Sequence, residues 1–372
     1  MLASQLGVRL ILWMGQTVPL PAPTEALDAL TRVEVTNDAQ NGDGFQITFT
    51  LARTQPGEYD LLRSGALQPS TRVIVGVLLG TTPEVLIDGI ITHHQHVPSS
   101  DPGGSTLTVT GRDVSIMLDL KEKNEKYENQ PDYLIVTQLI AGYAQYGLVP
   151  KVTPTSDVPI MLQRIPRQHE TDLRFIRRMG ERNGFVFYVE PLTFGVNTAY
   201  WGPQSRTGLP QAALTLGPSP SSNLVSLSFS QDALAPVNTS GTFLEPITKT
   251  AIPIPQLPSL RVPPLALTPT AALRTILLRD TSNQDAGQAA TSALAAITNS
   301  PDAVTGEGEV DSVRYGHVLR ARKLVGLRGA GISYDGAYYV SRVTHTIVRG
   351  DYKQSFSLSR EGTGSILPVV QP

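Results

Sequence analysis

The sequence predicts a mainly β protein in which a small α+β unit lies between two β domains. Apolar and polar residues alternate with a period of two over much of the first 110 residues, as half-buried antiparallel strands require. Two segments with helical spacing follow between residues 130 and 190, and strand patterns return towards the C-terminus. Short, frequent strands of this kind are typical of a sandwich or a small barrel.

The first β domain is expected over residues 1–118. Large apolar residues occupy every second position from Phe45 to Leu51, so one face of this strand is expected to point into a core. The turn sequences at 41–44 and 101–104 separate it from its neighbours, because Gly, Asn and Asp favour tight turns. Further strands are expected at residues 33–35, 73–79, 85–91 and 107–109.

The α+β unit is expected over residues 119–195, beginning with the polar linker 119–132. A first helix is expected around residues 136–143, where apolar residues recur with helical spacing, with Asp132 as its cap and Gly147 as its stop. A second helix is expected between Thr171 and Gly184, followed at once by an apolar, aromatic strand.

The second β domain is expected over residues 196–365, followed by a short tail at 366–372. Its middle contains a proline-rich segment at 252–270, which we expect to be an extended connector because proline has no N–H to donate to a sheet. An alanine-rich helix is expected at 284–298. Strands are expected at 224–229, 318–327, 338–348 and 352–358.

The composition favours a protein that makes permanent contacts. The 372 residues suffice for two or three domains. Charged residues make up 17% of the chain and the formal net charge is −2, whereas soluble domains have about 25% charged residues. A weakly charged surface suits assembly, and a nearly neutral chain gives no reason to expect nucleic-acid recognition.

The chain has no cysteine, which excludes disulfides, cysteine-bound zinc and thiol chemistry. The apolar run Leu10–Met14 is shorter than the roughly 7–15 residues of a signal-peptide core. No apolar stretch approaches the ~20 residues of a membrane span. We therefore expect a soluble protein that is made in the cytoplasm, has no signal peptide and has no stable membrane anchor.

Two groups of residues suggest metal sites. His94 and His96 would point to the same side of a strand and could share an ion; without an identifiable third ligand, a solvated strand end is favoured. Glu307, Glu309 and Asp311 alternate along one strand. Glycoside hydrolysis needs two carboxylates across a cleft, so a polar strand face at an interface is favoured here, and calcium binding is the alternative.

Two basic runs could contact a partner. Four arginines follow Thr171 on the second helix, at 174, 177, 178 and 182, and the nearby acidic residues predict an ion-paired surface. For the second run, at 314–328, a partner contact and a solvated face are both open. Phosphate-binding glycine loops, Gly-x-Ser-x-Gly and His-Glu-x-x-His are absent from the sequence, so we expect no catalytic residue, no cofactor and no enzyme activity.

Two segments resemble proteins of contractile tails. Residues 161–190 resemble a block of phage tail hubs and type VI spike proteins, in which Glu-Ser/Thr-Asp opens a helix and Asn/Tyr-Gly ends it before an aromatic strand. Glu170, Thr171, Asp172, Phe175 and Gly184 match that block. Residues 306–320 and 336–347 resemble the last β domain of hubs of the phage late-control-D (gpD) type. The resemblance is thus to gp27-like baseplate hubs and to the hub portion of VgrG spike proteins.

The resemblance implies a structural role without chemistry. It implies a homotrimer in which two β-barrel-like domains per chain form a pseudo-sixfold ring, so that a sixfold tail tube can join a threefold spike. The implied partners are the tail tube protein, a spike or needle protein, baseplate wedge proteins and the tape measure protein. The particle would be a virion tail baseplate or an injection system, assembled in the bacterial cytoplasm.

The sequence departs from spike proteins because nothing that resembles a needle or a lysozyme domain follows the last β domain. We therefore expect the spike to be a separate polypeptide. The alternative function is a tail-associated β protein that binds or hydrolyses glycans, which would need stacked aromatic residues in a concave site. Aromatic residues are 6% of the chain, and Trp13 and Trp201 are its two tryptophans, so the hub is favoured.

Overall fold

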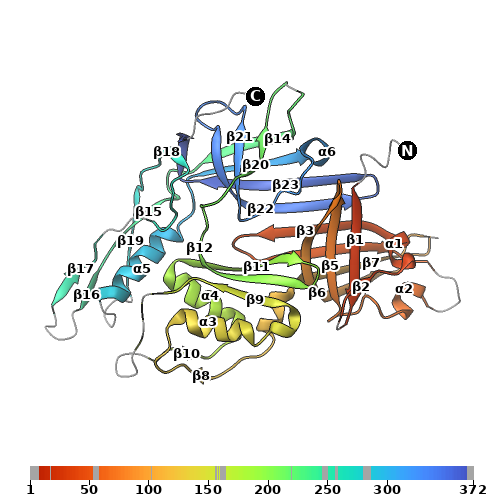
Figure 1. The fold of residues 1–372 in the computed structure, drawn as a ribbon, viewed down its shortest axis with the longest axis horizontal. Helices are drawn as coiled ribbons and strands as arrows, with labels where there is room; N and C mark the ends of the chain where they lie inside the picture. The colour runs from red at the N-terminus through yellow and green to blue at the C-terminus, as the bar shows by residue number, and fades with distance from the viewer. Residues whose placement is uncertain are drawn as a thin grey trace.

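The computed structural model describes residues 8–16, 18–52, 58–101, 103–155, 157, 159, 165–218, 220–244, 250–255, 259–279 and 286–366. Residues 161–164 of the tail-like block, Pro258 of the connector, residues 284 and 285 of the predicted helix and residues 367–372 of the tail lie outside these ranges. Within them, strands dominate the chain and helices are few and short (Figure 1). None of the described helices has the length and hydrophobicity to cross a membrane.

The first β unit contains the expected antiparallel strands and two short helices. Alternate residues of its strands, such as Phe45, Ile47 and Phe49, are buried in one hydrophobic core, as the period-two pattern predicts. The elements of this unit are β1 (Arg9–Gly15), β2 (Leu20–Pro21), α1 (Thr24–Ala29), β3 (Leu30–Asp38), β4 (Gly44–Thr50), α2 (Asp60–Arg63), β5 (Arg72–Leu79), β6 (Thr82–Val97) and β7 (Thr106–Asp113).

The α+β unit has its own core, in which two helices pack on a three-stranded sheet of order β11-β12-β9. The strand β12 lies beyond residue 195 and pairs in parallel with β9, so the sheet of this unit extends to Pro203. The elements are the 3-10 helix η2 (Val114–Asp119), β8 (Glu125–Lys126), α3 (Asp132–Ala141), the 3-10 helix η3 (Ala144–Tyr146), β9 (Leu148–Val152), β10 (Arg167–Gln168), α4 (Asp172–Asn183), β11 (Phe185–Thr193) and β12 (Val196–Pro203).

The second β unit surrounds a third core, which contains Tyr338, Val340, Phe356 and Leu358 among others. The predicted strand 318–327 begins only at Leu324, because residues 316–323 form an irregular turn between α6 and β21. The elements are β13 (Gln211–Thr215), β14 (Leu224–Gln231), β20 (Val304–Asp311), α6 (Ser312–Tyr315), β21 (Leu324–Arg328), β22 (Gly336–Val348), β23 (Asp351–Arg360) and β24 (Gly362–Ser365).

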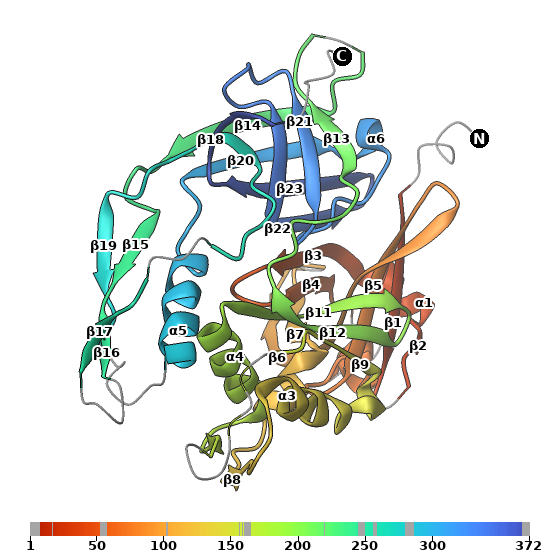
Figure 2. The same ribbon diagram turned by 60° about the vertical axis from the view of Figure 1, so that its left-hand side comes forward.

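The described residues between β14 and β20 form an arm that projects from the second β unit (Figures 1 and 2). The proline-rich segment is mainly extended, as predicted, although short strands occupy its two ends. The elements of the arm are β15 (Val237–Ser240), β16 (Thr242–Leu244), β17 (Ala251–Pro253), β18 (Ala266–Pro269), β19 (Arg274–Leu277) and α5 (Ala286–Thr298).

The two β units share one sheet, which the sequence did not predict. Strands of both units form a 13-stranded sheet whose main path has the order β14-β20-β23-β22-β3-β4-β7-β6-β5-β1-β2. The β3–β22 ladder joins the units, with His345 opposite Val35 and Arg342 opposite Asp38. All ladders of this sheet are antiparallel except β13–β21. A main-chain hydrogen-bonded seam therefore fixes one β unit against the other.

Candidate functional site at the junction of three units

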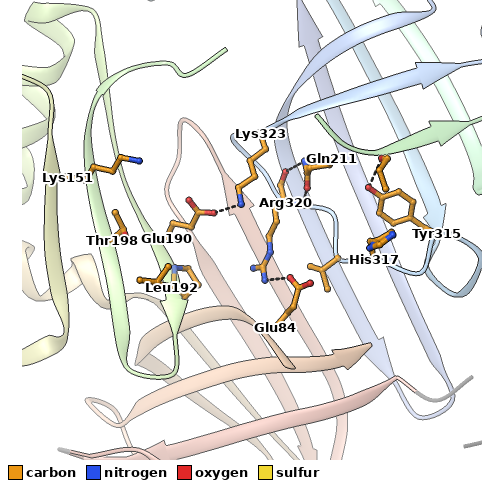
Figure 3. A pocket seen from close by; sticks show the side chains of 13 residues that line it. Glu84, Lys151, Glu190, Leu192, Thr198, Gln211, Tyr315, His317, Arg320 and Lys323 are labelled. Atoms are coloured by element: carbon orange, nitrogen blue, oxygen red, sulfur yellow. Dashed lines mark hydrogen bonds and ion pairs between the residues drawn. The ribbon is translucent and has the colours of Figure 1, made fainter. Parts of the chain in front are cut away.

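The three units meet around an open cavity of about 580 Å³. Figure 3 shows that its charged side chains come from all three of them. Glu84 lies in the first β unit, Lys151 and Glu190 lie in the α+β unit, and Arg320 and Lys323 lie in the turn before β21.

Ion pairs cross this cavity from one unit to another. The Arg320 guanidinium lies 2.6 Å from the Glu84 carboxylate and also donates to the main-chain oxygen of Val85. The Lys323 ammonium lies 3.2 Å from the Glu190 carboxylate. Both acidic residues of the lining are thus paired with a cation, and neither is placed as a free acid or base for hydrolysis. The site can hold three units in one arrangement.

A buried ion pair also joins the units, through Arg322, the residue between Arg320 and Lys323 in sequence. Both terminal nitrogens of Arg322 donate hydrogen bonds to the Asp43 carboxylate. One of them also donates to the main-chain oxygen of Asp38 at 2.7 Å. The guanidinium stacks on the Tyr188 ring, 4.4 Å from the ring centroid. Burial by itself lowers the pKa of Arg322, but the adjacent Asp43 outweighs burial and raises it. Arg322 therefore stays charged while it contacts both other units. This corrects the sequence-based view of the second basic run, because Arg320 and Arg322 bind inside the chain.

A second carboxylate lies beside this pair. Asp113 accepts from the backbone N–H of Asp43 at 3.2 Å and from that of Ser115 at 2.7 Å. Burial, followed by the charge of Asp43, raises the pKa of Asp113. The network thus continues from the turn before β21 through the first β unit to η2, where the α+β unit begins.

Another buried ion pair joins the first β unit to the α+β unit. Arg72 on β5 binds the Asp88 carboxylate on β6 through two nitrogens, at 2.8 and 2.6 Å. The same guanidinium donates to the main-chain oxygens of Tyr146 and Gly195, and Asn197 donates to Asp88 at 2.8 Å. Both charged residues lie in or next to strand-forming segments, and nothing in the sequence around them indicates that they pair with each other.

The tail-like block contains the whole of α4 and the beginning of β11. Thr171 is the N-cap, with its hydroxyl accepting from the Arg174 N–H at 3.4 Å and donating to the Asp119 carboxylate at 2.5 Å. Gly184 ends the helix in the left-handed conformation with φ of 68°, which glycine adopts without steric cost. These ends agree with the helix expected between Thr171 and Gly184.

Asp172 is fully buried and lies at the centre of a polar cluster. Its carboxylate accepts from Lys123 at 2.6 Å, from the Tyr143 hydroxyl at 2.8 Å and from Gln168 at 2.7 Å. The cluster ties α4 to β10, to the residues before β8 and to the segment after α3. Asp172 thus positions parts of the fold, and its oxygens are fully engaged with protein donors.

Glu170 and Phe175 flank this cluster. Glu170 is partly buried and pairs at 2.6 Å with Arg178, which is exposed. Phe175 is buried and stacks on Tyr127 with 5.6 Å between ring centroids, while Arg178 covers its ring. Some of the arginines of α4 are therefore ion-paired, because Arg182 also binds Asp132 at 2.6 Å.

Asp132 does not cap α3, contrary to the sequence-based prediction. It is the first residue of the helix, after Pro131, and its buried carboxylate accepts from Arg182 and Asn183 of α4. The helix ends at Ala141, and Gly147 instead ends η3. A carboxylate at a helix start can bind another helix equally well, and the local sequence does not distinguish the two uses.

His94 and His96 lie near the end of β6, next to a bulge between Ile91 and His93. The His96 ring packs edge-to-face on Tyr59 at 4.9 Å. Burial, followed by the charges of His96 and His93, lowers the pKa of His94. Among the described residues, no group of three or more His, Cys, Asp or Glu side chains is arranged to hold a metal ion.

No protein-family model and no curated protein sequence matches the chain. Its structure is similar to a tail protein of Neisseria meningitidis MC58, with a TM-score of 0.63, 15% identity and coverage of 96% of this chain and 98% of that one. It is equally similar to the 43 kDa tail protein of prophage MuSo2 from Shewanella oneidensis, with a TM-score of 0.64, 15% identity and coverage of 95% and 99%.

A third similar structure is the E. coli c3393 protein, with a TM-score of 0.56, 14% identity and coverage of 92% and 77%. That protein is a component of the type VI secretion system and is structurally similar to the T4 bacteriophage tail proteins gp27 and gp5. These similarities extend over all three units and the arm. The chain therefore has the fold of phage and prophage tail proteins, which is also the fold of gp27-like hubs and VgrG-type proteins.

Proposed function

We propose that this chain is the central structural hub of a contractile tail baseplate and has no enzyme activity. The observation that carries the proposal is the agreement of its fold with two tail proteins along almost the full length of both partners. A fold can host several functions, so the site must support the same conclusion. The junction cavity does so, because its acidic residues are used in ion pairs between units.

A hub must transmit force without bending between its parts. The buried Arg322–Asp43 and Arg72–Asp88 pairs each connect two or more units, and the β3–β22 ladder joins the β units by main-chain hydrogen bonds. Interdomain contacts without such features allow relative motion. The junction of this chain thus favours a rigid joining piece.

The proposed assembly is a homotrimer. Each chain supplies a first β unit and a second β unit, separated by the α+β unit, which begins with η2 and ends with β12 at Pro203. If the two β units are barrel-like and equivalent, three chains present six similar positions to a sixfold tail tube and keep threefold symmetry for a separate spike. Both units are built mainly of antiparallel strands, as two units of similar architecture would be. Baseplate wedge and tape measure proteins are further proposed partners, and the tail baseplate is the proposed location.

The native mass of the purified full chain tests the proposal first. We expect a particle with three times the mass of one chain at micromolar concentration. Mixed with the tube and spike proteins encoded beside it, the trimer should form a complex that sediments with both and shows threefold symmetry by electron microscopy. A monomer that binds neither protein, or a chain that cleaves peptidoglycan or capsule, would refute the hub.

A further inference from the structure

The arm contains a strand whose side chains have no cover within the described chain. In β19, all four residues are exposed, and Leu273, Ile276 and Leu277 are 69%, 40% and 61% exposed. The strand pairs in parallel with β15, and these two strands form a sheet of their own. Parallel sheets are normally covered on both faces, and a lone two-stranded sheet is marginally stable in water. The β19 surface therefore lacks part of the burial that such a sheet needs.

The root of the arm is held firmly against the body. The buried Asp302 accepts from Arg206 at 2.8 and 2.9 Å and from Arg261 at 2.9 Å. Glu361 accepts from the backbone N–H of Ala266 at 2.8 Å and pairs with the same Arg206. The arm is consequently presented in a fixed direction with its apolar strand outward, which lowers the entropy cost of binding.

A second apolar surface lies at the other end of the molecule. It is the corner formed by β2 and α1, where Val18, Leu20 and Leu27 are 68%, 64% and 39% exposed. Figures 1 and 2 show the arm and this corner at opposite ends of the molecule in both views. One chain therefore has two separate apolar surfaces that cannot reach each other within the same copy.

The two surfaces carry opposite charges. The strand and its flank carry the exposed Arg274 and Arg279, whereas the corner carries the exposed Glu25 and Asp28. Arg349 also reaches the corner, but its guanidinium donates to the main-chain oxygen of Asp28. Opposite charges at the edge of an apolar contact steer association and fix its register.

We propose that the arm of one copy packs on the β2–α1 corner of the next copy, so that β19 and its flank, 273–279, meet residues 18–28. A contact between two different surfaces is heterologous, and it either closes into a ring or continues as a filament. The proposal rests on the trimer of the proposed function and specifies which surfaces form it. In that ring, every copy gives its arm and receives one.

Introduced cysteines test the contact directly, because the chain has none of its own. The variant that combines Leu20→Cys and Leu277→Cys should give covalent trimers with a short bismaleimide, while each single variant should stay uncross-linked. Ile332→Cys, 88% exposed in the loop after β21, is the matched control and should also stay uncross-linked. Cross-linking of Leu277→Cys alone would show that arms pair with arms. That result, or no cross-linking in the double variant, overturns the proposal.

Reversing the charges on the two surfaces tests the arm contact separately from the existence of a trimer. Arg274→Glu with Arg279→Glu should raise the dissociation constant of the assembly by roughly tenfold or more. Adding Glu25→Arg and Asp28→Arg to the same chain should restore assembly. If the wild type is a trimer and Arg274→Glu with Arg279→Glu leaves it unchanged, the arm contact is wrong and the hub stands. If the wild type is a monomer at every concentration, the proposed trimer fails as well.

Discussion

His345 is a buried histidine in the seam between the two β units. It lies on β22 between Val35 of β3 and Gln354 of β23, and its Nδ1 is 2.9 Å from the Tyr352 hydroxyl. Burial, followed by the charge of Arg320, lowers the pKa of His345 to about 3. The folded chain thus keeps this ring neutral at pH values where an unfolded chain protonates it.

The pH dependence of stability should report this histidine. Between pH 6.5 and pH 3 the unfolded chain binds a proton at His345 that the folded chain does not, so stability falls as the pH falls. Each pKa unit is worth about 1.4 kcal/mol, so lowering the pH from 7.5 to 5 should remove about 2 kcal/mol through this residue. Urea unfolding at both pH values measures it. His345→Gln keeps a polar group beside Tyr352 and should reduce the difference by this amount; an unchanged difference would exclude His345 as the cause.

Asp172 and its neighbour Glu170 should differ sharply in their contribution to stability. Asp172→Ala removes the acceptor of three donors in a buried cluster and should cost about 3 kcal/mol. Glu170→Ala breaks a pair whose other partner, Arg178, is exposed and stays solvated, so it should cost about 1 kcal/mol or less. Urea unfolding of both variants measures the difference. Equal costs would show that the tail-like block does not depend on the buried cluster.

At the scale of elements, two glycines fix the position of the β11–β12 hairpin against η3. Gly147 and Gly195 have nearly the same left-handed φ, 78° and 79°. A Cβ at Gly147 would lie 1.9 Å from the main-chain oxygen of Gly195, whereas a Cβ at Gly195 meets nothing within 4 Å. That oxygen also accepts from Arg72. The close approach of the two backbones thus lies directly beside a contact between units.

Alanine at these two positions separates backbone strain from close packing. Gly195→Ala should cost about 1–2 kcal/mol, the penalty of a left-handed alanine. Gly147→Ala should cost at least about 2 kcal/mol more, because the hairpin must shift and the contact with Arg72 is lost. Thermal unfolding of the two variants gives the difference. Similar melting temperatures would mean that the hairpin moves without cost.

Local signals predicted some elements well and failed for others. The helix α4 was predictable because its N-cap Thr171, its Gly184 stop and its apolar spacing all agree. The prediction that Asp132 caps α3 was wrong, because its carboxylate binds Arg182 and Asn183 of α4. That contact depends on a segment about 50 residues away in the sequence. The strands of the first unit followed from alternation, whereas the parallel pair β15–β19 left no comparable pattern.

At the scale of the whole molecule, the sequence could not show that the β units share a sheet. The β3–β22 ladder joins residues that lie about 300 positions apart, and alternation marks a strand without naming its partner. The same limit applies to the junction. Arg320 and Arg322 stood out only as part of a basic run, and their acidic partners lie in segments that looked like ordinary strand ends and turns.

The Arg322–Asp43 pair should hold the three units in one cooperative fold. Arg322→Ala leaves the Asp43 carboxylate buried without its cation, and breaking a buried pair in this way costs about 3–5 kcal/mol. Arg342→Ala is the matched control at the same seam. Arg342 is about half exposed, and its buried partner Asp38 keeps hydrogen bonds from the backbone N–H groups of Gln40 and Asn41, so this variant should cost only about 1–2 kcal/mol. Urea unfolding followed by tryptophan fluorescence measures both variants: Trp13 reports on the first β unit and Trp201 on the α+β unit.

We expect Arg322→Ala to lower the urea midpoint strongly and to let the units unfold separately, giving two transitions. If instead both variants unfold in one transition with equal midpoints, the sheet seam alone couples the units and the buried pair does not.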